Sequence, residues 1–410
     1  MKDDFISENK ETVSSRFFVF SLGVSNFAIS AMPLLVSLLL VDIGNTFGTD
    51  VGLTSQMNTA HSVAAVLFAL LISAWSMRSS YRFLLVIGLV LSSVSALGCF
   101  LALDFPTMLL LYAGSGAGYV MVYSMSLALV GEHLALEKRA GAIGWVVACG
   151  AIVYFVGAPL IAVAASYGGW RFPVAAFIIP ALLVSLMLAL ISLPSTRSQP
   201  TPRSVDWRSS LKGFREVFSN RSALACFAGD FFRASSFVII LVYAASFGRE
   251  RFLHSREVAS IIVLIAALCY TIGSLASGQF VKRFGRKETT VLSAFLAGLL
   301  GGSYVFMPYE AVYLPLVFAA SWFFGMVTSS ASSLSLEQIP SLRGTMMSID
   351  SAAVNLGSAF GTAIGGIVLL LLDYEGLGGI LGTMGGISAL VFLLFSKDPT
   401  CNQQTTQTQH

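Results

Sequence analysis

Charged residues are scarce in this chain, and their scarcity excludes a water-soluble fold. Asp, Glu, Lys and Arg make up 11% of the 410 residues, whereas hydrophobic residues make up 56% and the mean hydropathy is +0.80. A soluble domain carries roughly 25% charged residues. This composition is typical of an integral membrane protein surrounded by a lipid bilayer.

Residue patterns for cofactor, metal or nucleotide chemistry are also missing. The five cysteines are scattered without a close pair, and no Cys or His spacing fits a metal site. An ATP-driven pump needs a phosphate-binding glycine loop, and none is present. The net charge is only +3, and no basic stretch is interleaved with aromatic residues, so nucleic acid is not an expected partner. The sequence therefore predicts neither an enzyme nor a cofactor or metal site.

What the chain does contain is a series of long apolar runs. A helix needs about 20 apolar residues to cross a bilayer, and twelve runs reach this length. Because backbone amides in hydrocarbon must be bonded within the segment, such runs form helices. We therefore predict an all-α integral membrane protein with twelve transmembrane helices. The expected spans are 17–41, 51–75, 83–103, 107–130, 141–166, 172–193, 222–247, 258–278, 288–307, 312–335, 344–372 and 376–396.

A short basic loop follows two of these runs at matching places. The later copy, from Gly278 to Lys287, reads Gly-Gln-Phe-Val-Lys-Arg-Phe-Gly-Arg-Lys. The earlier copy, from Ser73 to Arg82, reads Ser-Ala-Trp-Ser-Met-Arg-Ser-Ser-Tyr-Arg. The copies stand 205 positions apart, which is half of the 410 residues. Duplication of a membrane unit is the architecture of secondary transporters.

The boundary between the two units is expected in a polar segment near the middle of the chain. This segment contains three prolines and six basic residues, and its part 205–218 is expected to form an amphipathic helix on the membrane surface. The last residues are rich in Gln and Thr, which predicts disorder. The expected divisions are an N-terminal segment 1–16, a six-helix bundle 17–193, a linker 194–221, a second six-helix bundle 222–397 and a tail 398–410.

The basic residues predict the orientation in the membrane. If the N-terminus is cytoplasmic, the cytoplasmic segments hold 19 of the 24 Lys and Arg residues. Lys and Arg are enriched in cytoplasmic loops of membrane proteins. We therefore expect a multi-pass protein of the cell membrane with both termini in the cytoplasm.

These features together resemble the major facilitator superfamily, over residues 15–397. The signature turn of that family, Gly-x-x-x-Asp-Arg-x-Gly-Arg-Arg, follows its second and eighth helices. The earlier copy here keeps two arginines but has serines in place of glycines, and both copies lack the aspartate. The later copy matches the signature at Gly278, Arg283, Gly285, Arg286 and Lys287. The resemblance implies two pseudo-symmetric six-helix bundles that alternate in exposing a central cavity, and we expect a monomer.

The resemblance also implies a gate at the cytoplasmic ends of the helices. Glu132 is followed by Arg139, and 205 positions later Glu337 is followed by Arg343. In the family such acids and bases lock the two halves together. The alternative is that the basic residues only anchor the cytoplasmic side. The complete expected gating set is Arg78, Arg82, Glu132, Arg139, Gly278, Arg283, Gly285, Arg286, Glu337 and Arg343.

Candidate substrate and coupling residues lie on the helices that line the cavity in that family. Asp230 and Arg233 stand three residues apart inside the seventh span, where ionisable groups are costly and usually face an aqueous path. A structural ion pair is the alternative. For His61 the alternative is a histidine that only packs in the core. The Ser and Thr side chains often form hydrogen bonds within their own helix. Asp350 is a weaker candidate, because it can support the start of its helix. The expected set is Asn26, Ser30, His61, Tyr119, Tyr123, Asp230, Arg233 and Thr328.

The predicted function is export of small, partly apolar organic compounds in exchange for protons. Export members of the family carry a Gly-Pro motif in the fifth helix and often a Gly-Trp-Arg turn after it. Here Ala158 precedes Pro159, and Gly169, Trp170 and Arg171 form the turn. Tight helix packing explains the small residues equally well. Two alternatives stay open: uptake of a small metabolite with protons, and a membrane receptor or scaffold that keeps the fold without transport.

Overall fold

The computed structural model describes residues 2–49, 51–194, 207–254 and 256–399, which are almost entirely helical. A π-helical turn over Val174–Ile178 and two 3₁₀ turns, Tyr304–Phe306 and Pro340–Leu342, interrupt the α-helices. The α-helices are α1 (Lys2–Leu38), α2 (Leu40–Phe47), α3 (Val51–Trp75), α4 (Tyr81–Leu101), α5 (Phe105–His133), α6 (Leu136–Gly168), α7 (Arg171–Pro173), α8 (Ile179–Ser192), α9 (Trp207–Ser219), α10 (Arg221–Arg251), α11 (Arg256–Phe284), α12 (Arg286–Ser303), α13 (Glu310–Gln338) and α14 (Arg343–Phe395).

The prediction of twelve membrane-spanning helices is confirmed. The described residues contain 12 helical segments that are long and apolar enough to cross a bilayer. The last two, Pro340–Leu369 and Leu371–Phe395, belong to the continuous helix α14. Asp373 has a φ of 54° and divides α14 into two spans at a kink. The chain thus reverses direction without a separate loop.

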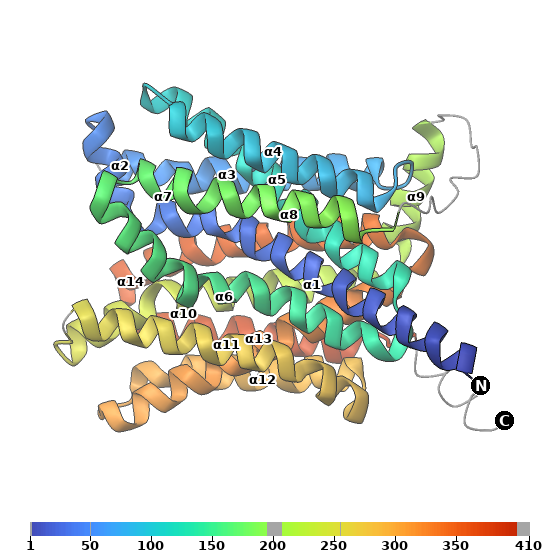
Figure 1. Cartoon of the computed structure of the whole chain (residues 1–410). Coiled ribbons are helices and arrows are strands. Elements are labelled where there is room, and N and C mark those ends of the chain that lie inside the picture. Colours follow the sequence, from blue (N-terminus) through green and yellow to red (C-terminus); the bar gives the residue numbers. More distant parts are fainter. Residues whose placement is uncertain (1, 50, 195–206, 255, 400–410) are drawn as a thin grey trace.

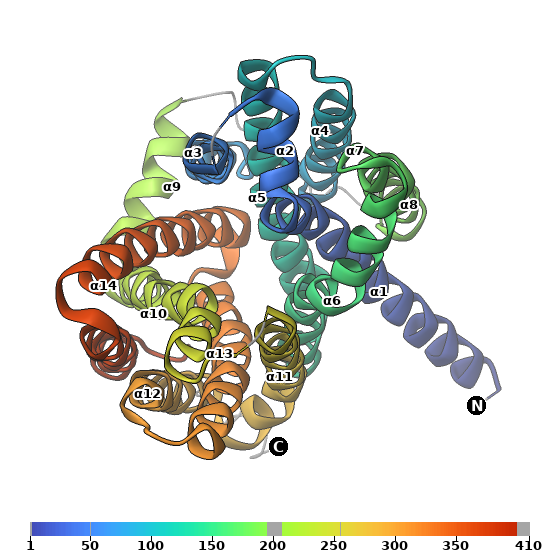
Figure 2. The ribbon, with the colours of Figure 1, turned by 90° about the vertical axis from the view of Figure 1, so that its left-hand side faces the viewer.

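The helices form two groups (Figure 1). Viewed along the helices, α1 to α8 lie on one side and α10 to α14 on the other (Figure 2). The groups contact each other mainly through α3 against α14 and α6 against α11. The expected linker falls between the two groups. Its residues 195–206 lie outside the described part of the chain, as do 400–410 of the expected tail, while its later part contains α9.

The two ends of the molecule differ. We call the end that carries α9 the linker end (Figure 1). The starts of α1, α4, α6 and α12 lie there, because each follows an even number of spans. The short helices α2 and α7 lie at the opposite end (Figure 1). The described start and end of the chain both lie at the linker end, as an even number of spans requires.

The outer surface of the bundle is apolar. Leu71, Leu110, Ile191 and Leu371 are each at least 60% exposed. In water, exposed apolar surface on this scale is unfavourable at about 25 cal/mol for each Å². A hydrocarbon environment removes that penalty, so these faces are suited to contact with lipid.

Short polar side chains fix where several helices begin. Asn220 accepts hydrogen bonds from the backbone N–H groups of Ser222 and Ala223 at the start of α10. Asp104 accepts from the N–H of Thr107 at 2.8 Å at the start of α5. Such caps satisfy donors that have no partner within the helix. They place the polar turns outside the apolar spans.

Candidate functional site

A cavity of about 370 Å³ lies between the two groups of helices. Its walls come from α1, α3, α5 and α6 on one side and from α10, α11, α13 and α14 on the other. This volume falls within the range of about 300–1,000 Å³ that is usual for small-molecule sites. The cavity is therefore the candidate substrate site.

Seven of the eight substrate and coupling residues expected from the sequence line this cavity. The eighth, Asp230, is fully buried behind the wall. The seven come from five helices, and they surround one space although they are far apart in the chain. They are Asn26, Ser30, His61, Tyr119, Tyr123, Arg233 and Thr328.

The polar groups of α1 are largely engaged within the protein. Asn26 Nδ2 donates to the Leu22 carbonyl at 2.9 Å and to Ser126 Oγ at 3.1 Å. Ser30 Oγ donates to the Asn26 carbonyl at 2.8 Å, which is the usual way for a helix serine to satisfy its hydroxyl. Asn26 Oδ1 is buried and accepts no hydrogen bond from the described residues. Asn26 is therefore the better ligand candidate of the two.

Aromatic rings form much of the cavity wall. Tyr119 and Tyr123 of α5 stack with centroids 6.2 Å apart and planes at 4°. Across the cavity, Phe237 of α10 lies 5.1 Å from Tyr270 of α11. The His61 ring is 5.8 Å from Tyr119, and its Nδ1 lies 3.0 Å from Ser115 Oγ. A flat, partly apolar molecule would fit between such rings.

The buried charges sit where α10 meets α13. Arg233 Nε donates to Asp230 Oδ1 at 2.6 Å, and Arg233 Nη1 donates to Thr328 Oγ1 at 2.8 Å. Asp230 is 0% exposed and Arg233 is 4% exposed. Burying these charges is tolerable only because each stabilises the other. Arg233 lines the cavity and is bonded to Asp230, whose charge lies behind the cavity wall.

Asp350 of α14 belongs to the same cluster, which the sequence alone did not indicate. Its carboxyl lies within hydrogen-bonding reach of the Asp230 carboxyl. Ser335 Oγ donates to Asp350 Oδ1 at 3.2 Å, and the side chain is 3% exposed. The expected role at a helix start does not account for this position, because Asp350 lies two turns inside α14. Two carboxyls from two helices therefore lie close together, and one of them is bonded to the Arg233 guanidinium.

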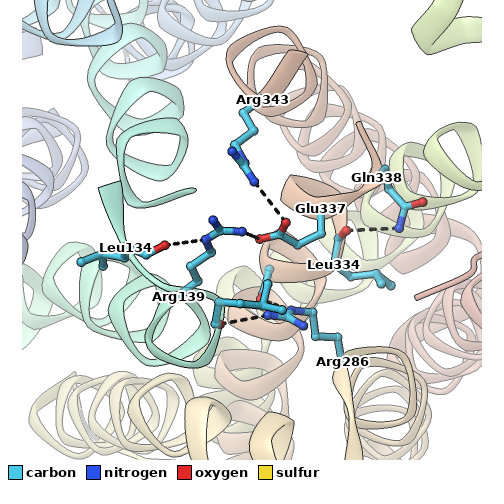
Figure 3. Close-up of polar contacts among 9 residues, drawn as sticks. Leu134, Arg139, Arg286, Leu334, Glu337, Gln338 and Arg343 are labelled. Atoms are coloured by element: carbon cyan, nitrogen blue, oxygen red, sulfur yellow. Dashed lines mark hydrogen bonds and ion pairs between the residues drawn. The ribbon is translucent and has the colours of Figure 1, made fainter. Parts of the chain in front are cut away.

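At the linker end, one acid joins the two groups of helices (Figure 3). Arg139 Nη1 of α6 donates to Glu337 Oε1 of α13 at 2.6 Å. Arg343 Nη2 of α14 donates to Glu337 Oε2 at 3.3 Å. The Glu337 side chain is 4% exposed. Both of its oxygens are thus bound to arginines in a site with little water.

The later basic turn adds further contacts across the same boundary, from Arg286 and Gly278. Arg286, drawn in Figure 3, donates from Nη2 to the Leu136 carbonyl of the other group at 3.2 Å and from Nε to Ser333 Oγ of its own group at 3.0 Å. A Cβ on Gly278 would lie 2.6 Å from Gly141 Cα. Only glycine permits this approach of α11 to α6. Gly285 has a φ of 94°, a conformation that favours glycine, and it ends α11 and begins α12.

The contacts that the structure describes for Arg82 and Arg283 lie within one group of helices. Arg82 Nη2 donates to the Leu190 carbonyl at 2.8 Å, which connects α4 to α8 within one group. Arg283 is exposed, with its guanidinium 5.3 Å from the centroid of the Phe284 ring. Arg78 is exposed in the earlier turn. Glu132 lies beside His133 at 3.8 Å and its side chain is 24% exposed. Glu132 is thus more exposed than Glu337, but the earlier turn also crosses the boundary: Thr345 Oγ1 donates to the Ser73 carbonyl at 2.9 Å, and the Gly344 N–H donates to the Tyr81 hydroxyl at 3.1 Å.

The cavity and the gate lie in different parts of the helices. Glu337, Arg139 and Arg343 stand at helix termini at the linker end. The cavity extends instead along the halves of the helices toward the opposite end, where it is lined by Pro33, Ala244 and Val317 among others. The contacts of Glu337 thus close the structure between the cavity and the linker end.

Several cavity residues were not expected from the sequence. Tyr154 of α6, Tyr270 of α11 and Asn355 of α14 line the wall, whereas Tyr112, the first of three tyrosines on α5, points to Asn58 instead. A single polar residue in a long apolar run resembles a packing residue. Among the residues that the structure describes, no three His, Cys, Asp or Glu are placed to hold a metal ion.

Comparisons with known proteins agree with this geometry. The family model of the Major Facilitator Superfamily matches residues 17–309 and 231–410. The Uncharacterized MFS-type transporter YceJ of Bacillus subtilis (strain 168) is 24% identical over 374 residues, covering 90% of this chain and 92% of that protein. The chain also has the fold of the fucose:proton symporter FucP of E. coli, with a TM-score of 0.78, 14% identity and coverage of 92% and 98% of the two chains. The proton:xylose symporter XylE gives a TM-score of 0.77 at 15% identity, with coverage of 94% and 97%.

Proposed function

This chain belongs to the Major Facilitator Superfamily, and we propose that it is a secondary active transporter that moves small, partly apolar organic compounds by alternating access. The observation that carries the proposal is a central cavity between two helix groups that are joined at the linker end by a buried ion pair. A site that is closed on one side and reached from the other is what a carrier needs in each of its two states.

We propose that the protein is a monomer in the cell membrane. In the proposed orientation the linker end faces the cytoplasm. The distribution of Lys and Arg supports this orientation. The state described above is then outward-facing, with Glu337 and its arginines closing the cytoplasmic side. To release substrate inward, the carrier has to break the Arg139–Glu337 and Arg286–Leu136 contacts and form others at the opposite end.

We propose protons as the coupling ion, because the cluster behind the cavity contains more acid than base. Asp230 and Asp350 are buried beside the single cation Arg233. A buried carboxylate without a full counter-charge is costly, and protonation removes that cost. Arg233 contacts both Asp230 and the cavity, so substrate and proton can influence each other.

Two directions of coupling are candidates. Export in exchange for protons is favoured by the sequence of α6 and by the turn after it. That turn also has a structural role, since Trp170 Nε1 donates to Thr46 Oγ1 at 2.9 Å and Arg171 Nη2 donates to the Ala102 carbonyl at 2.7 Å. Uptake together with protons is favoured by Asp350, because it adds a second ionisable helix to the cavity region.

The test is transport by purified protein in liposomes with a pH-sensitive dye inside. Library compounds are added with and without an imposed pH gradient. We expect some of them to move protons through the normal protein and none to do so through Arg233→Ala. If no compound moves protons, and none exchanges across the membrane in a counterflow assay, the chain is a receptor or scaffold and the proposal fails.

A further inference from the structure

One edge of the Arg233 guanidinium is left for a ligand. Its Nε and Nη1 donate to Asp230 and Thr328. Its Nη2 makes no hydrogen bond to the described residues. This nitrogen keeps some accessible surface, and the side chain lines the cavity. A side chain that is 96% buried thus presents a charged donor to the cavity. Guanidinium donors bind carboxylates most strongly.

Behind this arginine, one acceptor has no donor. Asp230 Oδ2 is buried and accepts no hydrogen bond from the described residues. The Asp350 carboxyl is within reach of Asp230, but a carboxyl donates only when it is protonated. A proton held between the two carboxyls would satisfy Oδ2. It would also make the cluster neutral, because two carboxylates and one guanidinium leave one negative charge uncompensated.

We propose that the cavity binds an organic carboxylate at Arg233 Nη2 and that the Asp230–Asp350 pair takes up a further proton when it binds. This inference rests on the proposed transport function and specifies its substrate class. With one proton already shared, the empty cluster is neutral. A bound carboxylate adds a negative charge in a region of low dielectric, and a second proton from water restores neutrality.

The surroundings of the cluster do not offer another counter-charge. The groups that act on Asp230, Arg233 and Asp350 from the packed helices are Tyr123 of α5, Cys226 of α10, Tyr270 of α11 and Ser335 of α13. None of these is a cation. His61 of α3 lines the same cavity, and its Nδ1 is engaged with Ser115. Of the described groups, the carboxyl pair is thus the one placed to neutralise the charge of a bound anion by taking up a proton.

The remaining wall favours an apolar or aromatic body on the carboxylate. The stacked rings of Tyr119 and Tyr123 line the same cavity as the pair formed by Phe237 and Tyr270. An organic cation would also suit aromatic rings, but it would have to lie beside the guanidinium. In the proposed complex the proton and the carboxylate are bound in the same state of the carrier. This favours transport of both in one direction over exchange.

The first test compares matched ligands on the full-length protein in detergent. A panel of aromatic and alkyl carboxylates, benzoate among them, is measured for binding by calorimetry beside the amide and the amine of each member. We expect at least one carboxylate to bind, about tenfold or more tighter than its amide and its amine. Arg233→Lys should remove this preference. The proposal is overturned if the amines or amides bind as well as the carboxylates, or if no carboxylate of the panel binds.

The second test counts protons. The calorimetry is repeated in buffers with different ionisation enthalpies, and the normal protein should take up about one proton for each bound carboxylate. Asp230→Asn combined with Asp350→Asn should bind the carboxylate with no uptake, because Arg233 alone then balances its charge, while Asp42→Asn, a change in an exposed carboxylate, should behave as normal protein. Proton release, or uptake that persists in the double variant, contradicts the proposal. If amines bind and are transported with proton release, only this inference fails; if nothing is transported, the proposed function fails.

Discussion

Arg139 and Glu337 lie 198 positions apart in the chain, yet Arg139 Nη1 donates to Glu337 Oε1 at 2.6 Å. They belong to different groups of helices, so this bond exists only while the linker end is closed. Arg343 binds the second oxygen of the same carboxylate. One buried acid therefore contributes two of the bonds that hold the linker end closed.

Replacement of that acid should open the linker end. In Glu337→Gln, two charge-assisted bonds are weakened, each of them worth about 1.5–3 kcal/mol. We expect the ratio of closed to open states to fall by about tenfold to a hundredfold. Labelling of a cavity cysteine from the linker side measures this ratio. Glu132→Gln, at the duplicated but more exposed position, should change it by less than about threefold; equal effects would contradict the asymmetric gate.

The two arginines of the later basic turn should behave differently. Arg286 is buried and donates to the Leu136 carbonyl across the boundary, whereas Arg283 is exposed. We expect Arg286→Ala to reduce transport by about tenfold or more, since it removes a hydrogen bond from a charged group across the boundary, worth about 1.5–3 kcal/mol. Arg283→Ala should retain most of the activity. Uptake assays at matched protein levels compare the two, and the reverse order would restore Arg283 as the gating residue.

The contact between α11 and α6 offers a pair of glycine variants. A Cβ on Gly278 would lie 2.6 Å from Gly141 Cα, but a Cβ on Gly141 would meet no atom within 4 Å. Gly278→Ala should therefore prevent full closure of the linker end and reduce transport, while Gly141→Ala should be tolerated. Transport rates and labelling from the linker side are the measurements. Normal closure in Gly278→Ala would show that the helices adjust easily.

The ion pair in α10 should respond differently to loss of its acid and loss of its base. Asp230→Asn should abolish accumulation driven by a pH gradient but leave substrate exchange without a gradient. Arg233→Ala leaves Asp230 buried without its cation, at a cost of about 3–5 kcal/mol, and should lower the yield of folded protein. Asp230→Asn combined with Arg233→Gln should recover that yield. Accumulation by Asp230→Asn would mean that Asp230 only stabilises Arg233.

The sequence was sufficient to predict the architecture because the bilayer imposes it. Apolar runs of spanning length have few alternatives to helices, so twelve spans were expected and 12 were found. The resemblance to the family predicted the cavity on α1, α5, α10 and α13, and polar or charged residues on each of these helices supported that prediction. The cavity was missed on α6, α11 and α14, where single residues such as Tyr154, Tyr270 and Asn355 face inward.

The charges were harder to predict than the helices, for a physical reason. Asp350 stands 120 positions after Asp230, and only the packing of α14 against α10 brings the two carboxyls together. The duplicated acids Glu132 and Glu337 likewise look equivalent in sequence. Burial separates them, and burial depends on the contacts between the two groups of helices.

The most direct test of alternating access measures distances between spin labels at both ends of the molecule by electron–electron double resonance. In protein without its five cysteines, one pair of labels replaces Lys138 and Arg283 at the linker end, and another replaces Leu103 and Tyr309 at the opposite end. All four positions are exposed. On introduction of Glu337→Gln, the account predicts a longer distance at the linker end together with a shorter one at the opposite end. Unchanged distances at the linker end, or lengthening at both ends, would contradict it.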